Sequence, residues 1–182
     1  EAIHSKVISA AELTPSDYIL KPFTVDVLSG RIARAIERRA LFLPTYQLID
    51  KGDLREAVKS CRAAELQHPR LAADFARLRA ELHLSLGEWT EAEQIYADML
   101  ASRPMAWAHL GLARTLFEQQ RHEEAQDALL ELVEAYPRYM AAYDLLAQNH
   151  EAMGQQVQAK KILEDAVAIS PHMVRRLRHL GG

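Results

Sequence analysis

The chain of 182 residues has a single cysteine, Cys61, and few glycines, prolines and aromatic residues. One cysteine excludes an internal disulfide framework and any thiolate cluster for zinc or an iron–sulfur centre. Seven glycines, seven prolines and 7% aromatic residues leave few hairpin turns and few strand-favouring side chains, so an all-β sandwich is disfavoured. With 49% hydrophobic and 26% charged residues, the composition is that of a globular and mainly helical chain.

Long apolar runs and an excess of positive charge are also absent from the sequence. No run of about 18 apolar residues is present, and the N-terminal residues lack the basic-then-apolar layout of a signal peptide, so we expect no membrane partner and a cytoplasmic location. The net charge is −3, and residues 40–171 hold 13 Lys and Arg against 20 Asp and Glu. Because an acidic surface repels phosphate backbones, nucleic acid is not an expected partner.

Four copies of one spacing organise most of the chain. In each copy a residue suited to a turn is followed five positions later by alanine and twelve positions after that by proline; the copies are Gly52–Ala57–Pro69, Gly87–Ala92–Pro104, Gln120–Ala125–Pro137 and Gly154–Ala159–Pro171. A small residue precedes each copy by seven positions: Thr45, Ala80, Ala113 and Ala147. Glycine can end a helix with positive φ, small residues let two helices approach closely, and proline ends the unit. The spacing therefore predicts helix–turn–helix pairs, with helices near 38–50, 53–67, 72–86, 88–102, 105–119, 121–135, 140–153 and 155–168.

This pattern resembles the tetratricopeptide repeat family, most clearly in the stretch MAAYDLLAQNHEAMGQQVQAKKILEDAVAISP at 140–171. The matching residues there are Tyr143, Leu146, Ala147, Gly154, Ala159, Leu163, Ala166 and Pro171. The third copy departs from the family pattern, because Gln120 stands where glycine is usual and its first helix has no bulky aromatic residue in the usual position. The resemblance implies an all-α, right-handed superhelical solenoid over 38–182, with repeats at 38–72, 73–105, 106–139 and 140–173 and a partial fifth repeat at 174–182 that forms a terminal helix.

The N-terminal residues carry a different signature. The sequence PSDYILKPF at 15–23 predicts a short apolar strand, and the sequence TVDVLSGRIARAIERR that follows predicts an amphipathic helix with Val25, Leu28, Ile32 and Ile36 on one face. Together they resemble the C-terminal end of a receiver domain of two-component response regulators. Residues 1–37 are therefore expected to be a truncated α/β receiver remnant.

That resemblance also implies roles for three residues. Lys21 would contact the phosphorylated aspartate of a receiver, Pro22 would follow it in a cis bond, and Tyr18 would be the aromatic switch residue. The acidic pair for Mg²⁺ and the phosphoacceptor lie on earlier strands in that family, so no cofactor is expected in this chain, and Mg²⁺ would belong only to an intact receiver. The receiver-like segment is also a candidate surface for a homodimer.

The junction between the two parts contains no Gly/Ser-rich linker. Gly30 is a lone glycine among good helix formers, and Pro44 is predicted to kink or restart a helix. We expect a stiff junction that passes a receiver rearrangement to the repeats as a rigid-body reorientation.

The family resemblance also indicates where a partner binds. First-helix residues would face a concave surface that holds a protein or peptide: Phe42, Tyr46, Arg77, Glu81, Trp107, Leu110, Arg114 and Asp144. Aromatic residues on such a surface can anchor a helix or an extended peptide, while arginine and acidic groups set its register. The alternative is that Phe42 and Trp107 pack between repeats. A basic stripe on the preceding helix is either a solvated face or a site for an anionic partner: Arg31, Arg34, Arg38 and Arg39.

No catalytic or metal site is expected. None of the eight histidines forms an HExxH motif or a His/Cys cluster, and His83 and His150 occupy equivalent repeat positions where packing is the expected role. Cys61 falls on a second helix at a core position, without a histidine–acid pair or a glycine-rich oxyanion turn to activate it.

These observations predict a non-enzymatic bacterial scaffold for protein–protein interaction, the output or adaptor part of a response-regulator-like protein in a two-component phosphorelay. The alternative is a transcriptional regulator whose repeats drive oligomerisation for a DNA-binding part outside this chain. A third possibility is a catalytic output domain that follows Gly182.

Overall fold

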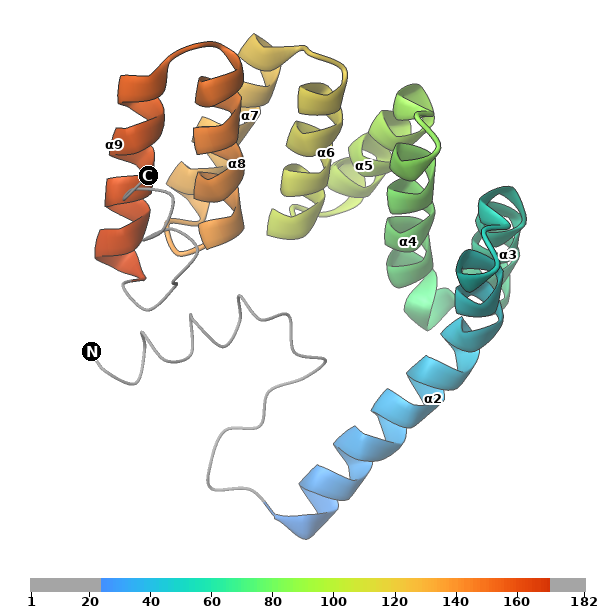
Figure 1. The fold of residues 1–182 in the computed structure, drawn as a ribbon. Helices are drawn as coiled ribbons and strands as arrows, with labels where there is room; N and C mark the ends of the chain where they lie inside the picture. Colours follow the sequence, from blue (N-terminus) through green and yellow to red (C-terminus); the bar gives the residue numbers. More distant parts are fainter. Residues whose placement is uncertain (1–23, 171–182) are drawn as a thin grey trace. The chain divides into compact units, whose positions relative to one another are not determined.

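The computed structural model of the protein describes residues 24–170. Over this range the chain folds into α-helices, one short 3₁₀ helix and connecting turns, with no β-strand (Figure 1). The elements in order are α2 (Val25–Asp50), α3 (Leu54–Gln67), η1 (Pro69–Leu71), α4 (Ala72–Ser85), α5 (Trp89–Ser102), α6 (Ala106–Glu118), α7 (His122–Ala135), α8 (Met140–Ala152) and α9 (Gln156–Ile169). From α3 onward each helix begins and ends within about a residue of the bounds that the repeat spacing predicts.

The described chain divides into two compact units between Leu86 and Gly87. The first unit holds α2 to α4, and its core is formed by Phe42, Ala57, Cys61, Phe75 and Leu82. The rings of Phe42 and Phe75 stack with their centroids 3.9 Å apart and their planes 9° apart. This aromatic pair ties the first helix of the first repeat to the first helix of the second repeat.

The second unit holds α5 to α9. One cluster joins α6, α7 and α8 through Ala113, Leu129, Leu132, Ala142 and Leu146. A second cluster joins α8 to α9 through Met140, Tyr143 and Ala166, and half-buried isoleucines pack against it. Each helix therefore packs on its neighbours in sequence, which confirms the stacking of helix–turn–helix pairs within this unit.

Small residues lie at the helix contacts, as the repeat spacing predicts. Thr45, Ala80, Ala113 and Ala147 are all buried. Thr45 also forms a hydrogen bond between its Oγ1 and Ser60 Oγ at 2.7 Å, so the one polar residue of this set has a partner inside the fold.

The turns between paired helices share one backbone geometry. Gly52, Gly87 and Gly154 have φ angles of 82°, 72° and 74°, and Gln120, in the equivalent position, has a φ of 60°. The N–H of Gln120 bonds to the carbonyl of Phe117 at 2.9 Å, as the N–H of Gly154 bonds to that of Glu151 at 2.9 Å. The third repeat therefore keeps the family turn although it lacks the glycine, and Gln120 holds a conformation that costs a residue with a Cβ atom about 1–2 kcal/mol.

The longest helix, α2, is continuous from Val25 to Asp50 and contains Pro44 in its interior. A restart at Pro44 was one expected outcome, and the structure shows that the helix does not restart there. Thr24 caps its N-terminus by accepting a hydrogen bond from the N–H of Val27 at 3.3 Å. The helix crosses residues 37 and 38, the proposed boundary between the receiver-like segment and the repeats, without a break.

Several expectations fall on parts of the chain that are not described. The strand near 18–20, the receiver-like residues Tyr18, Lys21 and Pro22, and the terminal helix at 174–182 all lie outside residues 24–170. The α/β receiver remnant therefore stays a prediction from sequence. The described fold is all-helical, in agreement with the main expectation.

Candidate functional site

The residues expected on the partner-binding surface lie on the first helix of each repeat. Phe42 and Tyr46 are on α2, Arg77 and Glu81 on α4, and the remaining four on α6 and α8 of the second unit. The two sets belong to different units, and each is described within its own unit.

In the second unit, α6 and α8 contact each other (Figure 1). The candidate residues on these two helices define what we call the α6–α8 face: Trp107, Leu110, Arg114 and Asp144. Their spacing on α6 places Trp107, Leu110 and Arg114 on one side of the helix. Trp107, Leu110 and Asp144 are half-buried, and Arg114 is exposed. Leu110 also packs against the core cluster of α6, α7 and α8, and this packing fixes the position of its side chain.

The helix α6 approaches α5 unusually closely at Gly111. A Cβ atom built on Gly111 would lie 2.8 Å from Cδ1 of Tyr96 and closer still to two other atoms of that ring. Tyr96 is fully buried, so its ring fills the space that a side chain on α6 would otherwise take. This contact fixes the position of α6 against α5 and therefore the orientation of the α6–α8 face.

In the first unit, Phe42 packs in the core, and its expected part in partner binding stays a prediction. Its side chain is buried and stacked on Phe75, so the alternative of packing between repeats is the one that the structure shows for Phe42. Tyr46 is 43% exposed, and its ring lies 5.8 Å from that of Phe42. Arg77 is exposed and Glu81 half-buried on α4.

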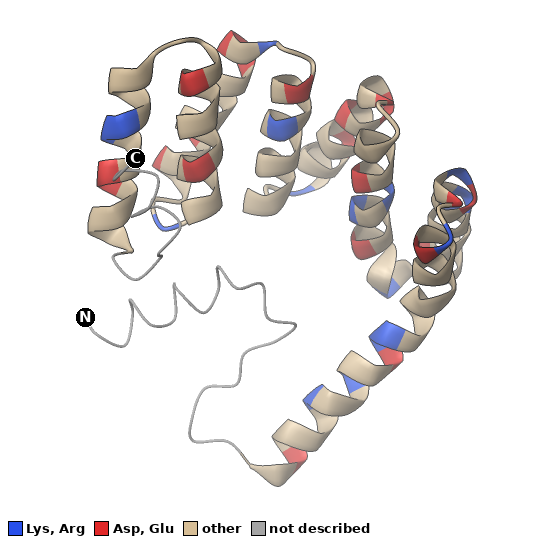
Figure 2. Ribbon diagram, in the orientation of Figure 1, with Lys and Arg blue, Asp and Glu red and all other residues tan. Residues whose placement is uncertain are grey.

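The basic stripe on α2 contains one residue with a clear structural role. Arg38 Nη2 donates a hydrogen bond to Asp74 Oδ1 at 3.0 Å, and its guanidinium lies 5.2 Å from the centroid of the Phe42 ring. Arg38 therefore joins α2 to α4 beside the aromatic pair rather than standing free for an anionic partner. Figure 2 shows the other basic residues spread along the middle of α2.

An ion-pair network that the sequence did not predict stands at the turn between α6 and α7. Arg121 Nη1 binds Glu93 Oε2 at 2.8 Å, and Arg121 Nη2 binds Glu124 Oε2 at 2.6 Å. Gln119 Nε2 also donates to Glu93 Oε2, at 2.7 Å. The hydrogen bond that Glu124 accepts from Arg121 lowers the pKa of Glu124, and the hydrogen bonds that Arg121 donates to Glu124 and Glu93 raise the pKa of Arg121. The network joins α5 to the turn in which Gln120 has its left-handed conformation.

The histidines take part in packing and in local hydrogen bonds. His83 and His150 are both buried. Nδ1 of His150 lies 2.7 Å from Oε1 of Gln155, while Asn149, fully buried, donates from Nδ2 to the carbonyl of His122 at 2.9 Å. Between residues 24 and 170 no three His, Cys, Asp or Glu side chains are grouped so that they could hold a metal ion.

Cys61 lies in the core of the first unit and is inert by environment. Burial, above all, and the charge of Glu65 raise the pKa of this thiol from its ordinary value of 9.0 to about 11, although the charge of Arg79 and a hydrogen bond with Thr45 act in the opposite direction. A thiol with this pKa stays protonated at neutral pH, so it is a poor nucleophile.

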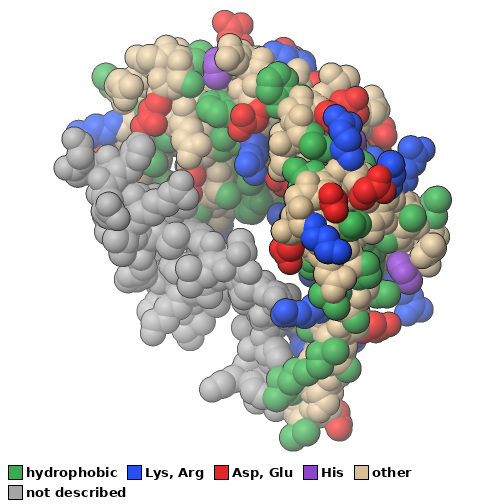
Figure 3. All heavy atoms as spheres, turned by 45° about the vertical axis from the view of Figure 1, so that its right-hand side comes forward, with side chains coloured by type: hydrophobic (Ala, Val, Ile, Leu, Met, Phe, Trp, Pro, Cys, Tyr) green, Lys and Arg blue, Asp and Glu red, His purple; other side chains and the backbone are tan. Residues whose placement is uncertain are grey.

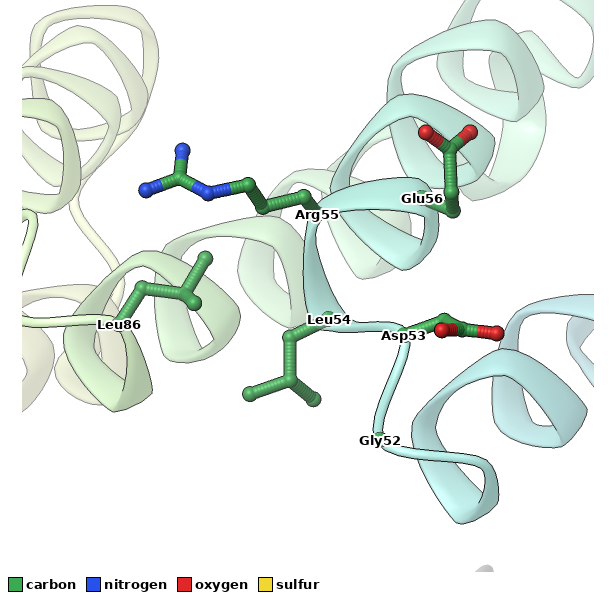
Figure 4. Close-up of a pocket in the computed structure, with 6 residues that line it drawn as sticks. All are labelled: Gly52, Asp53, Leu54, Arg55, Glu56 and Leu86. Carbon is green, nitrogen blue, oxygen red and sulfur yellow. The ribbon is translucent and has the colours of Figure 1, made fainter.

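Two hollows appear on the first unit. One, of about 280 Å³, lies at the turn before α3 and is lined by Gly52, Asp53, Leu54, Arg55, Glu56 and Leu86. Figure 4 shows Arg55 and Glu56 extending to different sides of the first turn of α3, so its charged groups do not converge on one point. The other, of about 640 Å³, follows α2 and is lined by residues from Ile32 to Asp50.

No helix in the described part of the chain has the length and apolar character needed to cross a membrane.

Comparison with known proteins agrees with the repeat geometry. A family profile for tetratricopeptide repeats matches residues 47–106, 89–140 and 110–173. No curated protein sequence matches the chain.

Solved structures with a similar fold come from several bacteria. They include MamA 41-end from Desulfovibrio magneticus RS-1, with 19% identity, a TM-score of 0.61 and coverage of 79% of this chain and 81% of that one. PilF of Pseudomonas aeruginosa has 24% identity and a TM-score of 0.63, with 81% of this chain and 68% of that one covered. A tetratricopeptide repeat protein from Parabacteroides merdae has 21% identity and a TM-score of 0.63, with 78% and 57% covered. At these identities the likeness concerns the fold alone.

Proposed function

The chain belongs to the tetratricopeptide repeat family, and from that premise we infer that it is a non-enzymatic scaffold that binds a protein partner through the α6–α8 face. Members of this family bind protein partners, and first helices of adjacent repeats form a shared surface. The observation that carries the proposal is the side-by-side placement of α6 and α8, with Trp107, Leu110 and Arg114 on one side of α6.

The chemistry of the α6–α8 face suits a short peptide segment. Trp107 and Leu110 offer half-buried apolar surface, and tryptophan is among the residues most often found at the energetic centre of protein interfaces. Arg114 and Asp144 supply charges of opposite sign on adjacent helices, which can set the direction and register of a bound segment. The partner is therefore a peptide segment, helical or extended, with a large apolar side chain flanked by polar groups.

The rigidity of the surrounding helices supports the same proposal. Leu110 is packed on the core, and the Gly111–Tyr96 contact fixes α6 against α5. A surface that is already ordered loses less conformational entropy when a partner binds. The unit thus presents a preorganised surface rather than one that forms on binding.

The proposal is tested with peptides selected from a display library against the full 182-residue chain. Affinities for the selected peptides are then measured by fluorescence anisotropy with Trp107→Ala, with Arg114→Ala and with Leu130→Ala as the matched control. Leu130 is 43% exposed on α7, a second helix, so its truncation removes an exposed apolar side chain away from the α6–α8 face. We expect Trp107→Ala to weaken binding at least about tenfold, since a loss of roughly 1.4 kcal/mol corresponds to that factor.

The control should leave the affinity unchanged. If the folded variants Trp107→Ala and Arg114→Ala bind the selected peptides as well as the wild type, the α6–α8 face is not the binding surface.

The proposal also places the chain in a response-regulator-like signalling protein. The sequence DYILKPF at 17–23 supports this context, and so does the continuous helix α2, which would connect a receiver directly to the first repeat. Grafting the earlier strands and helices of a receiver ahead of residue 1 tests this point, because phosphorylation of the completed receiver should change peptide affinity only when α2 is continuous. Insertion of a Gly-Ser linker at Gly30 should abolish that coupling and leave the basal affinity intact.

A further inference from the structure

The helix α2 carries a second apolar face besides the one that packs in the core. Six large hydrophobic residues of α2 are exposed, and four of them form what we call the outer stripe: Val25, Ile32, Ile36 and Leu43. Their side chains are 78%, 50%, 64% and 47% exposed, respectively. Figure 3 shows hydrophobic side chains gathered along this helix. Such a concentration of exposed aliphatic residues on one helix marks an interaction surface.

The outer stripe points away from the core of the first unit. With 3.6 residues per turn, its four residues fall within about 40° of one another around the helix axis. The buried residue Thr45 lies on the opposite side of α2, and the half-buried Leu41 and Leu48 pack on the core. The stripe is thus separate from the surface that α2 uses against α3 and α4.

The spacing of the stripe is that of a coiled-coil seam. Steps of four and three residues run through Val25, Ser29, Ile32, Ile36, Arg39, Leu43, Tyr46 and Asp50. Alternating steps of four and three residues average three and a half residues per step, which is the repeat that keeps one seam facing a partner helix. Ser29 does not interrupt it, because its hydroxyl donates to the carbonyl of Val25 at 2.7 Å within the same helix. Ala33 and Ala40 flank the seam and leave room for a second backbone.

We propose that the outer stripe binds the same stripe of a second copy of the chain, with the two α2 helices antiparallel. An interface of this kind is self-complementary under two-fold symmetry, which is the commonest arrangement of homo-oligomers. It does not depend on the peptide-binding function of the α6–α8 face. It concerns the 182-residue chain, in which Val25, Ile32 and Ile36 are exposed, and it is an alternative to the receiver-like context, in which the same face of α2 would pack on a receiver.

Charge complementarity decides the direction of the two helices. In a parallel pair, Arg39 would meet Arg39 of the partner subunit in the seam, and two like charges at that position repel each other. In an antiparallel pair with Ile32 opposite Ile36 of the partner subunit, Val25 lies opposite the partner's Leu43. Arg39 then lies within about one helical turn of the partner's Asp26, an exposed acid in the first turn of α2.

The size of the surface is sufficient for a specific dimer. α2 has 26 residues, which corresponds to a helix of about 39 Å at 1.5 Å per residue. Two such helices paired along their length bury on the order of 1,000 Å² in total, the lower bound for specific interfaces. A moderate affinity is therefore expected, with dimers present at micromolar concentrations.

The first test measures the molar mass of the full 182-residue chain by light scattering and sedimentation over a range of concentrations. We expect the wild type to reach twice the chain mass and Ile36→Glu to raise the dimer dissociation constant at least about 100-fold, because two carboxylates would be buried per interface. Leu66→Glu is the matched control, since Leu66 is 81% exposed on α3, away from the stripe, and should leave the dimer intact. Circular dichroism verifies that each variant is folded, and Ile32→Glu is a second variant with the same expectation.

A chain that stays monomeric at about 100 µM, or a dimer that Ile36→Glu and Ile32→Glu leave unchanged, overturns the proposal. Disulfide crosslinking tests the direction of the helices. A mixture of Ile32→Cys and Ile36→Cys chains should crosslink mainly between unlike chains, because only those positions face each other within reach of a disulfide. Crosslinks mainly between like chains would instead show a parallel pair and refute the antiparallel arrangement.

Discussion

The close contact between Gly111 on α6 and Tyr96 on α5 makes a sharp prediction for Gly111→Ala. The added methyl would lie 2.8 Å from Cδ1 of Tyr96 and nearer to Cε1 and Cζ, where carbon atoms normally stay about 3.5–4.0 Å apart. Because Tyr96 is fully buried, its ring cannot swing into solvent, and α6 must move away from α5 by about 1 Å.

The expected loss of stability follows from two opposing effects. Overpacking of a filled core costs about 1–3 kcal/mol, and the upper value applies here because three ring atoms are involved. Alanine recovers about 1 kcal/mol through its higher helix propensity than glycine. The net destabilisation is about 2 kcal/mol, which lowers the urea midpoint by roughly 1 M for an m-value near 2 kcal/mol/M.

The matched control is Gly30→Ala in α2. Gly30 is also inside a helix, but a Cβ atom there would meet nothing within 4 Å. This change should therefore stabilise the protein by up to about 1 kcal/mol through propensity alone. The double variant Tyr96→Leu/Gly111→Ala should lose less stability than the sum of the losses in the two single variants, because the smaller leucine side chain leaves room for the methyl group of the introduced alanine. If Gly111→Ala is as stable as Gly30→Ala in urea titrations followed by circular dichroism, the close approach of α5 and α6 does not exist.

Two further predictions concern the turn at Gln120 and the thiol of Cys61. Gln120→Gly should raise the free energy of unfolding by about 0.5–1 kcal/mol, because the relief of a left-handed conformation exceeds the added entropy of the unfolded chain. Gly154→Gln should lower the free energy of unfolding by a similar amount. If both variants are as stable as the wild type in thermal and urea unfolding, the geometry of these turns is contradicted. Cys61 should react with a thiol reagent at pH 8 at least about 100-fold more slowly in the folded protein than in urea, since its pKa is raised to about 11. Fast labelling of the folded protein would instead show that Cys61 is accessible. Because the thiol ionises at a lower pH in the unfolded chain than in the folded protein, the contribution of Cys61 to stability is constant below about pH 8 and falls as the pH rises from about 9 to 11.

Much of the fold can be predicted from the sequence because the repeat is encoded locally. Glycines in the left-handed turn and prolines at the unit ends stand at fixed distances, and the small residues between them mark where helices touch. Gln120 has the same left-handed conformation as the glycines of the other turns, because hydrogen bonds of the turn and the neighbouring Arg121 network stabilise that conformation. The repeat spacing was therefore sufficient to predict each helix from α3 to α9 to within about a residue.

The details of the site were harder to predict because they depend on contacts between distant residues. Phe42 occupies a first-helix position that faces partners in the family pattern, yet here it meets Phe75 on α4 and becomes part of the core. Local spacing does not predict the contact of Gly111 with Tyr96 or of Arg121 with Glu93, since each pair joins two separate elements of the fold. Pro44 was expected to kink or restart a helix, and the structure excludes only the restart, because α2 continues through Pro44 as one helix.

Hydrogen exchange followed by mass spectrometry, with and without a selected peptide, tests the binding surface most directly. We expect slower exchange in α6 and α8, residues 106–118 and 140–152, when the peptide is bound. Slower exchange confined to the second helices α7 and α9 would contradict it.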